Sequence, residues 1–409
     1  MLYYENRQTR QGEVIEVREK SIHKSIKVIA VLMLIIVAIY IVISDGGLGS
    51  GNITQQILVE SEELFNFDVK ENAYIGVNNK QIYKVTKDGI KAYNLDKEEV
   101  WSDTFTLNEV VVKQKSPYIV VGSRGGKSIH VFNEKGKQAE INAQSEVVYF
   151  SINENGNVVT IEDQGNKHHV TAYSPKGDFL CTRTSYVETD GYPTVAEISP
   201  NGETLLVSYV STKEPEVVST IIGINTKDNK NKEHDNVMYG LIERDNLVYS
   251  IGFLSEDTWV SIGDSHINWY DEDGNHKVNK QGIHSVFVPQ IPAVGVFKGG
   301  YLPLIVSSKP IQSTIHQDEK LVVFDSEGKE VVNNEIKEGV TNLYVSNESI
   351  VYETGGKYEG YNRLGNKLFT YSPTIDINRV IYFSDLKEGI AINKEKVVLL
   401  TPKSKEDKK

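Results

Sequence analysis

The chain has 409 residues and a formal net charge of −12, and 39% of its residues are hydrophobic. This acidic balance excludes broad docking on nucleic acid or on anionic lipid surfaces, because phosphate groups are bound by lysine and arginine. The single cysteine, Cys181, excludes an internal disulfide.

Residues 1–25 are polar and mixed in charge, with too few apolar side chains to build a core. We predict a short tail here, on the cytoplasmic side of a membrane. We infer the cytoplasmic side from the charges that flank the next segment.

An uninterrupted apolar run extends from Val28 to Ile43. With the residues just before it, the run reaches the roughly 20 residues that an α-helix needs to cross a membrane. Basic side chains precede the run and acidic ones follow it, which predicts a cytoplasmic N-terminus and an extracellular remainder. We therefore predict a single-pass transmembrane helix over residues 26–44 that anchors the chain in the cell membrane. The alternative is a signal peptide that is cleaved after Val42–Ser44.

Residues 45–55 contain four glycines. Glycine at this density predicts a flexible linker between the membrane helix and the rest of the chain.

A short signature recurs beyond the linker: an aromatic residue, then Asn, Asp or Ser, then two residues, then Gly. Five complete copies begin at Phe132, Tyr173, Tyr270, Phe324 and Tyr361, and two degenerate copies begin at Tyr93 and Ile224. An alternating apolar segment leads into each copy. We interpret each copy as a β-hairpin in which the polar side chain caps the turn and glycine takes a positive φ. Hairpins that repeat every 40 to 50 residues or so are typical of a β-propeller.

The predicted fold is all-β, a propeller over residues 56–402, with a polar tail at 403–409. The strand pattern gives seven four-strand units and a remainder of three strands, which end at Val397–Leu400. An open sheet edge invites aggregation, so we expect the segment between Ile57 and Val69 to supply the missing strand. This predicts eight four-stranded blades. Seven blades remain the alternative, if Ile57–Val85 and the C-terminal strands share one sheet.

The sixth unit departs from the pattern. We expect its strands at Val286–Val288, Val294–Phe297, Leu321–Phe324 and Glu330–Val332, with an insertion, Gly299–Lys320, between the second and third. The insertion contains an apolar run at residues 301–306 that the repeat pattern does not require. We expect an elaborated loop or an extra hairpin here. Its apolar run predicts a loop that faces a partner or a lipid surface, with partner contacts through Tyr301, Leu302, Leu304 and Ile305.

The motifs of common active sites and metal sites are missing, and we predict no catalytic, cofactor-binding or metal-binding residues. The acidic segment Asp271–Asn275 is accounted for by the fifth hairpin turn. His168 and His169 are neighbours on an expected strand, where their side chains point to opposite faces, so we expect a surface or edge position. The three tryptophans fit core positions better than ligand platforms: Trp101, Trp259 and Trp269.

Two segments carry a resemblance to known propellers. Gly89–Trp101 is similar to a blade of quinoprotein-like propellers, which often end in Trp, and Ser199–Glu203 resembles the turn of periplasmic WD40-like repeats. A tail, one helix and an acidic propeller together resemble uncharacterised single-pass membrane proteins of Gram-positive, Clostridia-like bacteria. The resemblance implies a fold and a location, and no catalytic residues. It implies no quinone cofactor, because the adjacent cysteines of many such dehydrogenases are absent.

Three functions follow as hypotheses. The first is a non-enzymatic envelope protein that presents a rigid surface to a protein or cell-wall partner, and an exposed apolar loop would favour it. The second is an extracellular enzyme, such as a glycan hydrolase or lyase, that uses the propeller funnel. Carboxylates and histidines that converge on the axis with shifted pKa values would favour this one. The third is a ligand sensor that signals through the short tail.

Overall fold

The computed structural model describes residues 55–211, 213, 216–227, 236–287, 299–307, 319–346 and 349–403. The predicted tail and transmembrane helix lie outside these residues, as do the linker before Gln55 and the polar end after Lys403. Within the described ranges, no helix has the length and apolar character needed to cross a membrane.

Within the described residues, six sheets of four strands follow one another, each pairing its strands in sequence order. The first three sheets are β2 (Tyr74–Asn78), β3 (Gln81–Thr86), β4 (Gly89–Tyr93) and β5 (Glu99–Thr104); β6 (Val110–Lys115), β7 (Tyr118–Ser123), β8 (Ser128–Asn133) and β9 (Gly136–Asn142); β10 (Glu146–Ile152), β11 (Val158–Asp163), β12 (Lys167–Tyr173) and β13 (Phe179–Tyr186). The next three are β14 (Tyr192–Ile198), β15 (Thr204–Ser211), β16 (Val218–Asn225) and β17 (Val237–Arg244); β18 (Val248–Phe253), β19 (Thr258–Gly263), β20 (His266–Asp271) and β21 (His276–Gln281); β22 (His284–Phe287), β23 (Leu302–Ser307), β24 (Lys320–Phe324) and β25 (Glu330–Glu335). A 3-10 turn, η1 (Val69–Glu71), precedes β2, and a short helix, α2 (Val187–Asp190), links β13 to β14.

The seventh sheet has eight strands and joins the two ends of the described chain. One half contains β26 (Val340–Val345), β27 (Ile350–Thr354), β28 (Lys357–Tyr361) and β29 (Lys367–Tyr371). The other half contains β30 (Arg379–Phe383), β31 (Glu388–Ile392), β32 (Lys396–Pro402) and the first strand of the structure, β1 (Gln56–Asn66). Counted as two halves, this sheet brings the number of four-strand units to eight, as predicted from the sequence.

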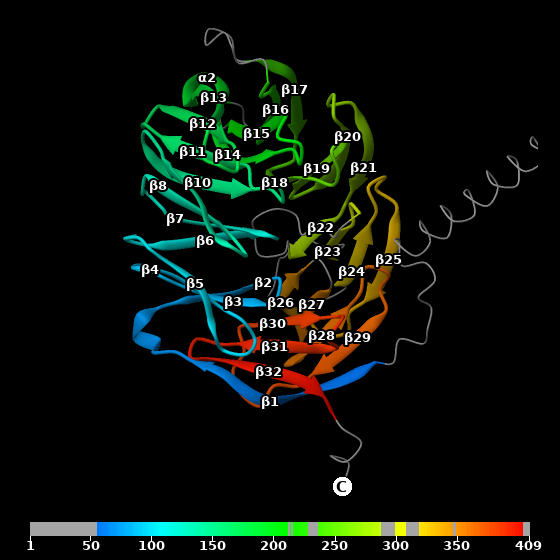
Figure 1. Cartoon of the computed structure of the whole chain (residues 1–409). Coiled ribbons are helices and arrows are strands. Elements are labelled where there is room, and N and C mark those ends of the chain that lie inside the picture. Colours follow the sequence, from blue (N-terminus) through cyan, green and yellow to red (C-terminus); the bar gives the residue numbers. More distant parts are fainter. Residues whose placement is uncertain are drawn as a thin grey trace, which may run out of the picture. The chain divides into compact units, whose positions relative to one another are not determined.

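The N-terminal strand completes the last unit, which confirms the predicted closure. β1 pairs antiparallel with β32, from Leu58 opposite Pro402 to Asn66 opposite Lys396. Its first three residues also pair in parallel with β29 of the seventh unit. Figure 1 shows β1 beside β32, although they lie at opposite ends of the sequence.

Eight hydrophobic clusters hold the units together, and each cluster lies between two neighbouring units. One of them joins the last unit to the first, with Ile390 and Val397 packed beside Ile75 and Ile82. The first strands of successive units also contact one another, as β6 with β10 and β10 with β14. The sheets therefore form a closed propeller whose first strands surround the axis, as Figure 1 shows.

The repeated turns have the predicted geometry. In the sixth unit, Gly328 has a φ of 73° and its N–H donates to the Asp325 carbonyl oxygen at 3.0 Å. Asp325 Oδ1 accepts hydrogen bonds from the backbone of Glu327 and Lys329, at 3.0 and 2.9 Å. The degenerate turn of the first unit uses Lys97 at a φ of 70° in place of glycine. These local bonds explain why the signature could be read from sequence.

The sixth unit corrects one prediction. Its second strand is β23, not Val294–Phe297, which lies outside the described residues. β23 lies between β22 and β24 and is buried on both faces, so Leu302, Leu304 and Ile305 are fully buried. Tyr301 is half-buried and packs beside the cluster that joins the sixth and seventh units. The prediction that Leu302, Leu304 and Ile305 lie in an exposed loop is therefore wrong.

Candidate functional site

Three polar side chains converge from the first strands of the second, third and fourth units. They are Lys113 on β6, Tyr149 on β10 and Glu197 on β14. We call these three residues the axis cluster, because first strands surround the propeller axis. Each comes from a different unit, so the fold and not the local sequence brings them together.

The geometry of the axis cluster centres on Tyr149. Its hydroxyl donates a hydrogen bond to Glu197 Oε1 at 3.2 Å. Lys113 Nζ lies 5.7 Å from the centre of the Tyr149 ring, within the range of a cation–π contact. An ion pair lies close by, with Lys115 Nζ 3.3 Å from Glu154 Oε2.

Burial controls the charge of this cluster. Glu197 is 2% exposed, and burial raises the pKa of its carboxyl to about 7, against the pull of Lys115, Tyr149 and Lys113. Burial also lowers the pKa of Lys113, an effect that the charge of Glu197 opposes. Glu197 is therefore poised to gain or lose a proton near neutral pH.

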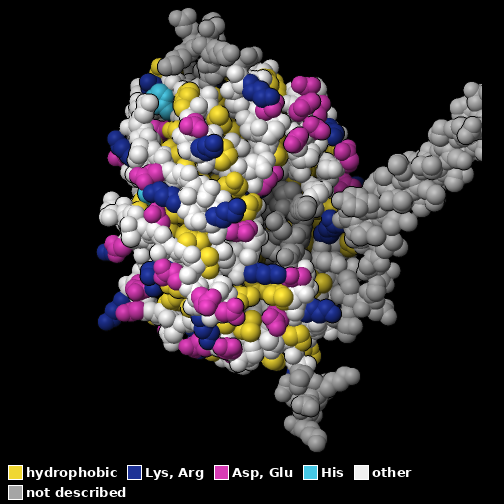
Figure 2. Space-filling model, in the orientation of Figure 1, with side chains coloured by type: hydrophobic (Ala, Val, Ile, Leu, Met, Phe, Trp, Pro, Cys, Tyr) yellow, Lys and Arg dark blue, Asp and Glu magenta, His cyan; other side chains and the backbone are white. Residues whose placement is uncertain are grey.

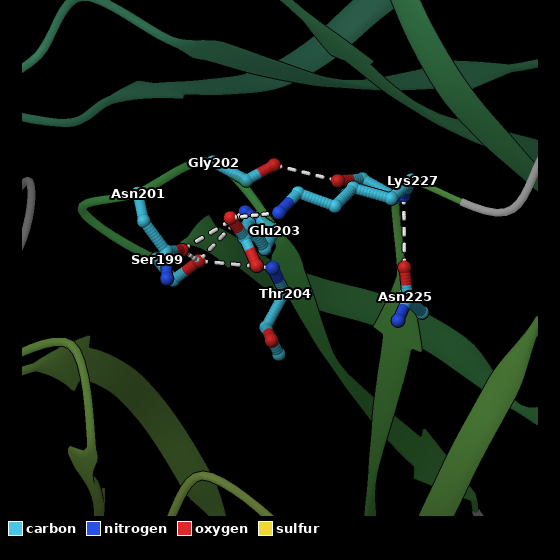
Figure 3. A network of polar contacts seen from close by, with 8 residues as sticks. Ser199, Asn201, Gly202, Glu203, Thr204, Asn225 and Lys227 are labelled. Atoms are coloured by element: carbon cyan, nitrogen blue, oxygen red, sulfur yellow. Dashed lines mark hydrogen bonds and ion pairs between the residues drawn. The ribbon is translucent and has the colours of Figure 1, made fainter.

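The turn after β14 fixes the strand end that carries Glu197. Ser199 Oγ accepts hydrogen bonds from the backbone N–H groups of Glu203 and Thr204, at 3.1 and 2.9 Å. Figure 3 shows this turn beside the turn of the neighbouring hairpin, where Lys227 forms an ion pair with Glu203. Asn153 of the third unit donates to the Ser199 carbonyl oxygen at 2.8 Å and ties the two units together.

A second polar group lies on the first strands of the eighth, first and seventh units. The Arg379 guanidinium lies 5.3 Å from the ring centre of Tyr74 and 5.3 Å from that of Tyr344. Its Nη1 donates to the Tyr74 hydroxyl at 3.0 Å. This arginine packs between aromatic side chains and holds three units together.

Other buried carboxylates bind many donors and connect strands. Glu243 on β17 accepts hydrogen bonds from Ser261 at 2.5 Å and from Asn268 and Tyr270, both at 2.9 Å. These donors lie on the fifth unit, so Glu243 connects the fourth and fifth units. Its role is structural.

The histidines differ in part from expectation. His168 is fully buried on the face toward Tyr192, whose ring centre lies 4.7 Å away, so the predicted surface position is wrong for it. His169 is half-buried, and its Nδ1 lies 3.1 Å from Thr184 Oγ1. In the part of the chain that the structure describes, no three His, Cys, Asp or Glu side chains could hold a metal ion.

The tryptophans and the acidic turn follow the predictions. Trp259 and Trp269 are fully buried in the core, and Trp101 is half-buried with its ring stacked on Phe132 at 5.6 Å. Asp271 caps its own turn, accepting from the backbone of Asn275 at 2.7 Å.

Sequence reasoning missed the axis cluster. Glu197 stands in an apolar strand, between Ala196 and Ile198, and that isolated carboxylate was the available signal. Its partners, Lys113 and Tyr149, are far away in the sequence and carry no motif.

Comparison with known proteins gives a family and a set of distant structures. The family DUF5711, a family of unknown function, matches residues 55–400. No curated protein matches the chain. Among solved structures, BamB from Moraxella catarrhalis is 13% identical with a TM-score of 0.48, over 84% of this chain and 99% of that one. Sqt1 from Chaetomium thermophilum is 11% identical with a TM-score of 0.47, over 85% and 100%. Kluyveromyces lactis Hsv2 is 12% identical with a TM-score of 0.43, over 81% and 98%.

Proposed function

The chain belongs to the DUF5711 family, whose function is unknown, and from this premise we propose that it is a membrane-anchored interaction scaffold. An eight-bladed propeller, held by a helix over residues 26–44, presents a rigid, non-enzymatic surface outside a bacterial cell membrane. The charge asymmetry around Val28–Ile43 supports the anchor and its orientation. A protein or a cell-wall polymer is the expected partner.

One recurring surface feature supports the proposed scaffold function. Three last strands of the repeat expose an apolar side chain at the same place, the second residue of the strand. These residues, with their exposed fractions, are Val100 at 47%, Met238 at 42% and Val331 at 38%. These side chains occupy the same position in different units, and they do not pack in the hydrophobic core. In the view of Figure 2, hydrophobic side chains lie in small groups among charged ones.

The test is chemical cross-linking in cells that express the full-length protein. We expect a cross-linked adduct with the wild type and its loss in the combined variant Val100→Ser, Met238→Ser and Val331→Ser. The matched control changes Leu364 and Leu386 to Ser, which are also exposed but lie in turns. An adduct that persists in the triple variant, or is lost equally in the control, would contradict the proposed surface.

A second candidate is a ligand-responsive propeller, either a sensor or an enzyme active on glycans. The observation that favours it is Glu197, a carboxyl on a first strand whose pKa is raised by burial to about 7. Such a group is a marker of functional sites. A ligand requirement for the cross-linked adduct would favour this candidate over a passive scaffold.

A further inference from the structure

Among the described residues, Glu197 receives fewer hydrogen bonds than two other buried carboxylates, Glu162 and Glu243. Among the described residues, its one donor is the Tyr149 hydroxyl. Glu243 has donors on three residues of the next unit, and Glu162 accepts from the backbone of Gln144 and Ser145 and from a threonine. A carboxyl group has about four acceptor positions. Glu197 therefore keeps hydrogen-bonding capacity that the described residues do not fill.

The repeat does not require an acid at this place. Glu197 is the second-to-last residue of its first strand. The same position in the first strands of six other units holds Val77, Gln114, Ser151, Gly252, Tyr344 and Tyr382. A buried acid is costly unless it is neutral or well paired. Its presence here is explained by something other than blade formation.

The charges around Glu197 favour an anion. Lys113 and Lys115 lie on β6, and the charge of each lowers the pKa of Glu197, whereas the charge of Glu154 raises it. These two lysines stand on an inner strand of a chain whose net charge is −12. Lys113 and Tyr149 are only half-buried, so a small ligand has surface to contact.

We propose that Lys113, Tyr149 and Glu197 form a binding site for a small oxyanion, a carboxylate or a phosphate, at the propeller axis. The Lys113 ammonium supplies charge, and the Tyr149 hydroxyl keeps its hydrogen bond to Glu197 Oε1 and so orients the carboxyl. Protonated Glu197 donates its O–H to the anion, so binding takes up one proton from solvent onto Glu197. Lys115 stays paired with Glu154 at the edge of the site. The proposed anion site is independent of the scaffold function, and its test does not rely on that function.

The test measures thermal unfolding of the full-length protein with sodium acetate and with sodium phosphate. Sodium chloride and tetramethylammonium chloride at equal ionic strength are the controls. A ligand of the native state raises the unfolding midpoint. We expect one of the two anions to raise it in a saturable way, with an apparent Kd about tenfold tighter at pH 6 than at pH 8. If acetate raises the unfolding midpoint, the ligand group is a carboxylate, and if phosphate raises it, the ligand group is a phosphate.

Two variants separate the site from a general salt effect. Lys113→Met removes the charge and should weaken binding about tenfold or more. Glu197→Gln keeps a donor but cannot titrate, so its affinity for acetate should differ little between pH 6 and pH 8. For phosphate, which itself titrates in this range, the pH dependence should be smaller in the variant than in the wild type. Lys87→Met, at an exposed lysine, is the matched control and should bind like the wild type.

Three results would overturn the proposal. They are no midpoint shift with either anion, wild-type binding by Lys113→Met, or an unchanged pH dependence in Glu197→Gln. If Lys113→Met fails to fold, the pH dependence of Glu197→Gln decides.

Discussion

At the scale of single residues, the glycine of the repeated turn has two duties. The first is its backbone conformation, as at Gly365, where φ is 74°. The second is close packing between units, because a Cβ atom at Gly365 would lie 2.7 Å from Val332 Cγ1 on the last strand of the preceding unit. The equivalent glycines, Gly274 and Gly328, also lie against side chains of the unit before them. The turn signature therefore positions neighbouring units as well as closing a hairpin.

Alanine substitutions can separate these duties. Gly282 has a φ of 66°, and a Cβ atom added there would meet no atom within 4 Å beyond its chain neighbours, so Gly282→Ala reports the conformational cost alone. We expect it to lower the free energy of unfolding by about 1 kcal/mol. Gly365→Ala should cost more, since its methyl group also meets Val332. Urea unfolding of both variants measures the difference, and equal losses would show that the contact between units is not limiting.

Glu197 gives a prediction about pH. The pKa of this carboxyl is about 7 in the folded protein against an ordinary value of 4.5. Between these values the folded state keeps a proton that the unfolded state loses. The stabilising contribution is therefore complete below pH 4.5 and is lost as the pH rises to about 7, with a total of roughly 3 kcal/mol.

Urea unfolding of the wild type and of Glu197→Gln, at several pH values between 4.5 and 7.5, measures this contribution. The wild type should lose stability relative to the variant as the pH rises. Parallel pH profiles would mean that Glu197 has an ordinary pKa in the folded state.

At the scale of elements, the sequence predicted the hairpins well and one central strand badly. The turns were predictable because their hydrogen bonds are local, as in the Asp325 turn. β23 was not, because a strand buried on both faces lacks alternation and reads as a plain apolar run. The axis cluster was invisible for a related reason, since three separate units supply Lys113, Tyr149 and Glu197.

The closing strand offers a matched pair of neighbouring residues. Leu58 on β1 is 1% exposed and packs between the last two units, whereas Ile57 is 59% exposed. We expect Leu58→Asp to cost several kcal/mol or to prevent folding, because it buries an unpaired charge. Ile57→Asp should change stability by no more than about 0.5 kcal/mol. Soluble yield and thermal unfolding measure both, and a stable Leu58→Asp variant would show that the ring does not need this strand.

At the scale of the whole molecule, Gln55 is the boundary between the predicted linker and the propeller. The described fold begins there, and its first strand closes the ring. The expected anchor ends about ten residues earlier, so the linker leads directly into the closing strand. In this account the tether and the closure of the propeller are consecutive parts of the chain, with the ring outside the membrane.

The orientation of the chain is the central claim, and thiol labelling tests it most directly. Cys181 is 1% exposed, and burial raises its pKa to about 12, so the native thiol gives little background. New cysteines replace Lys176, exposed in a propeller turn, and Gln11, in the predicted tail. With a membrane-impermeant maleimide on intact cells, Lys176→Cys should be labelled at once and Gln11→Cys only after permeabilisation. Protection of Lys176→Cys in intact cells, with labelling after permeabilisation, would contradict the account.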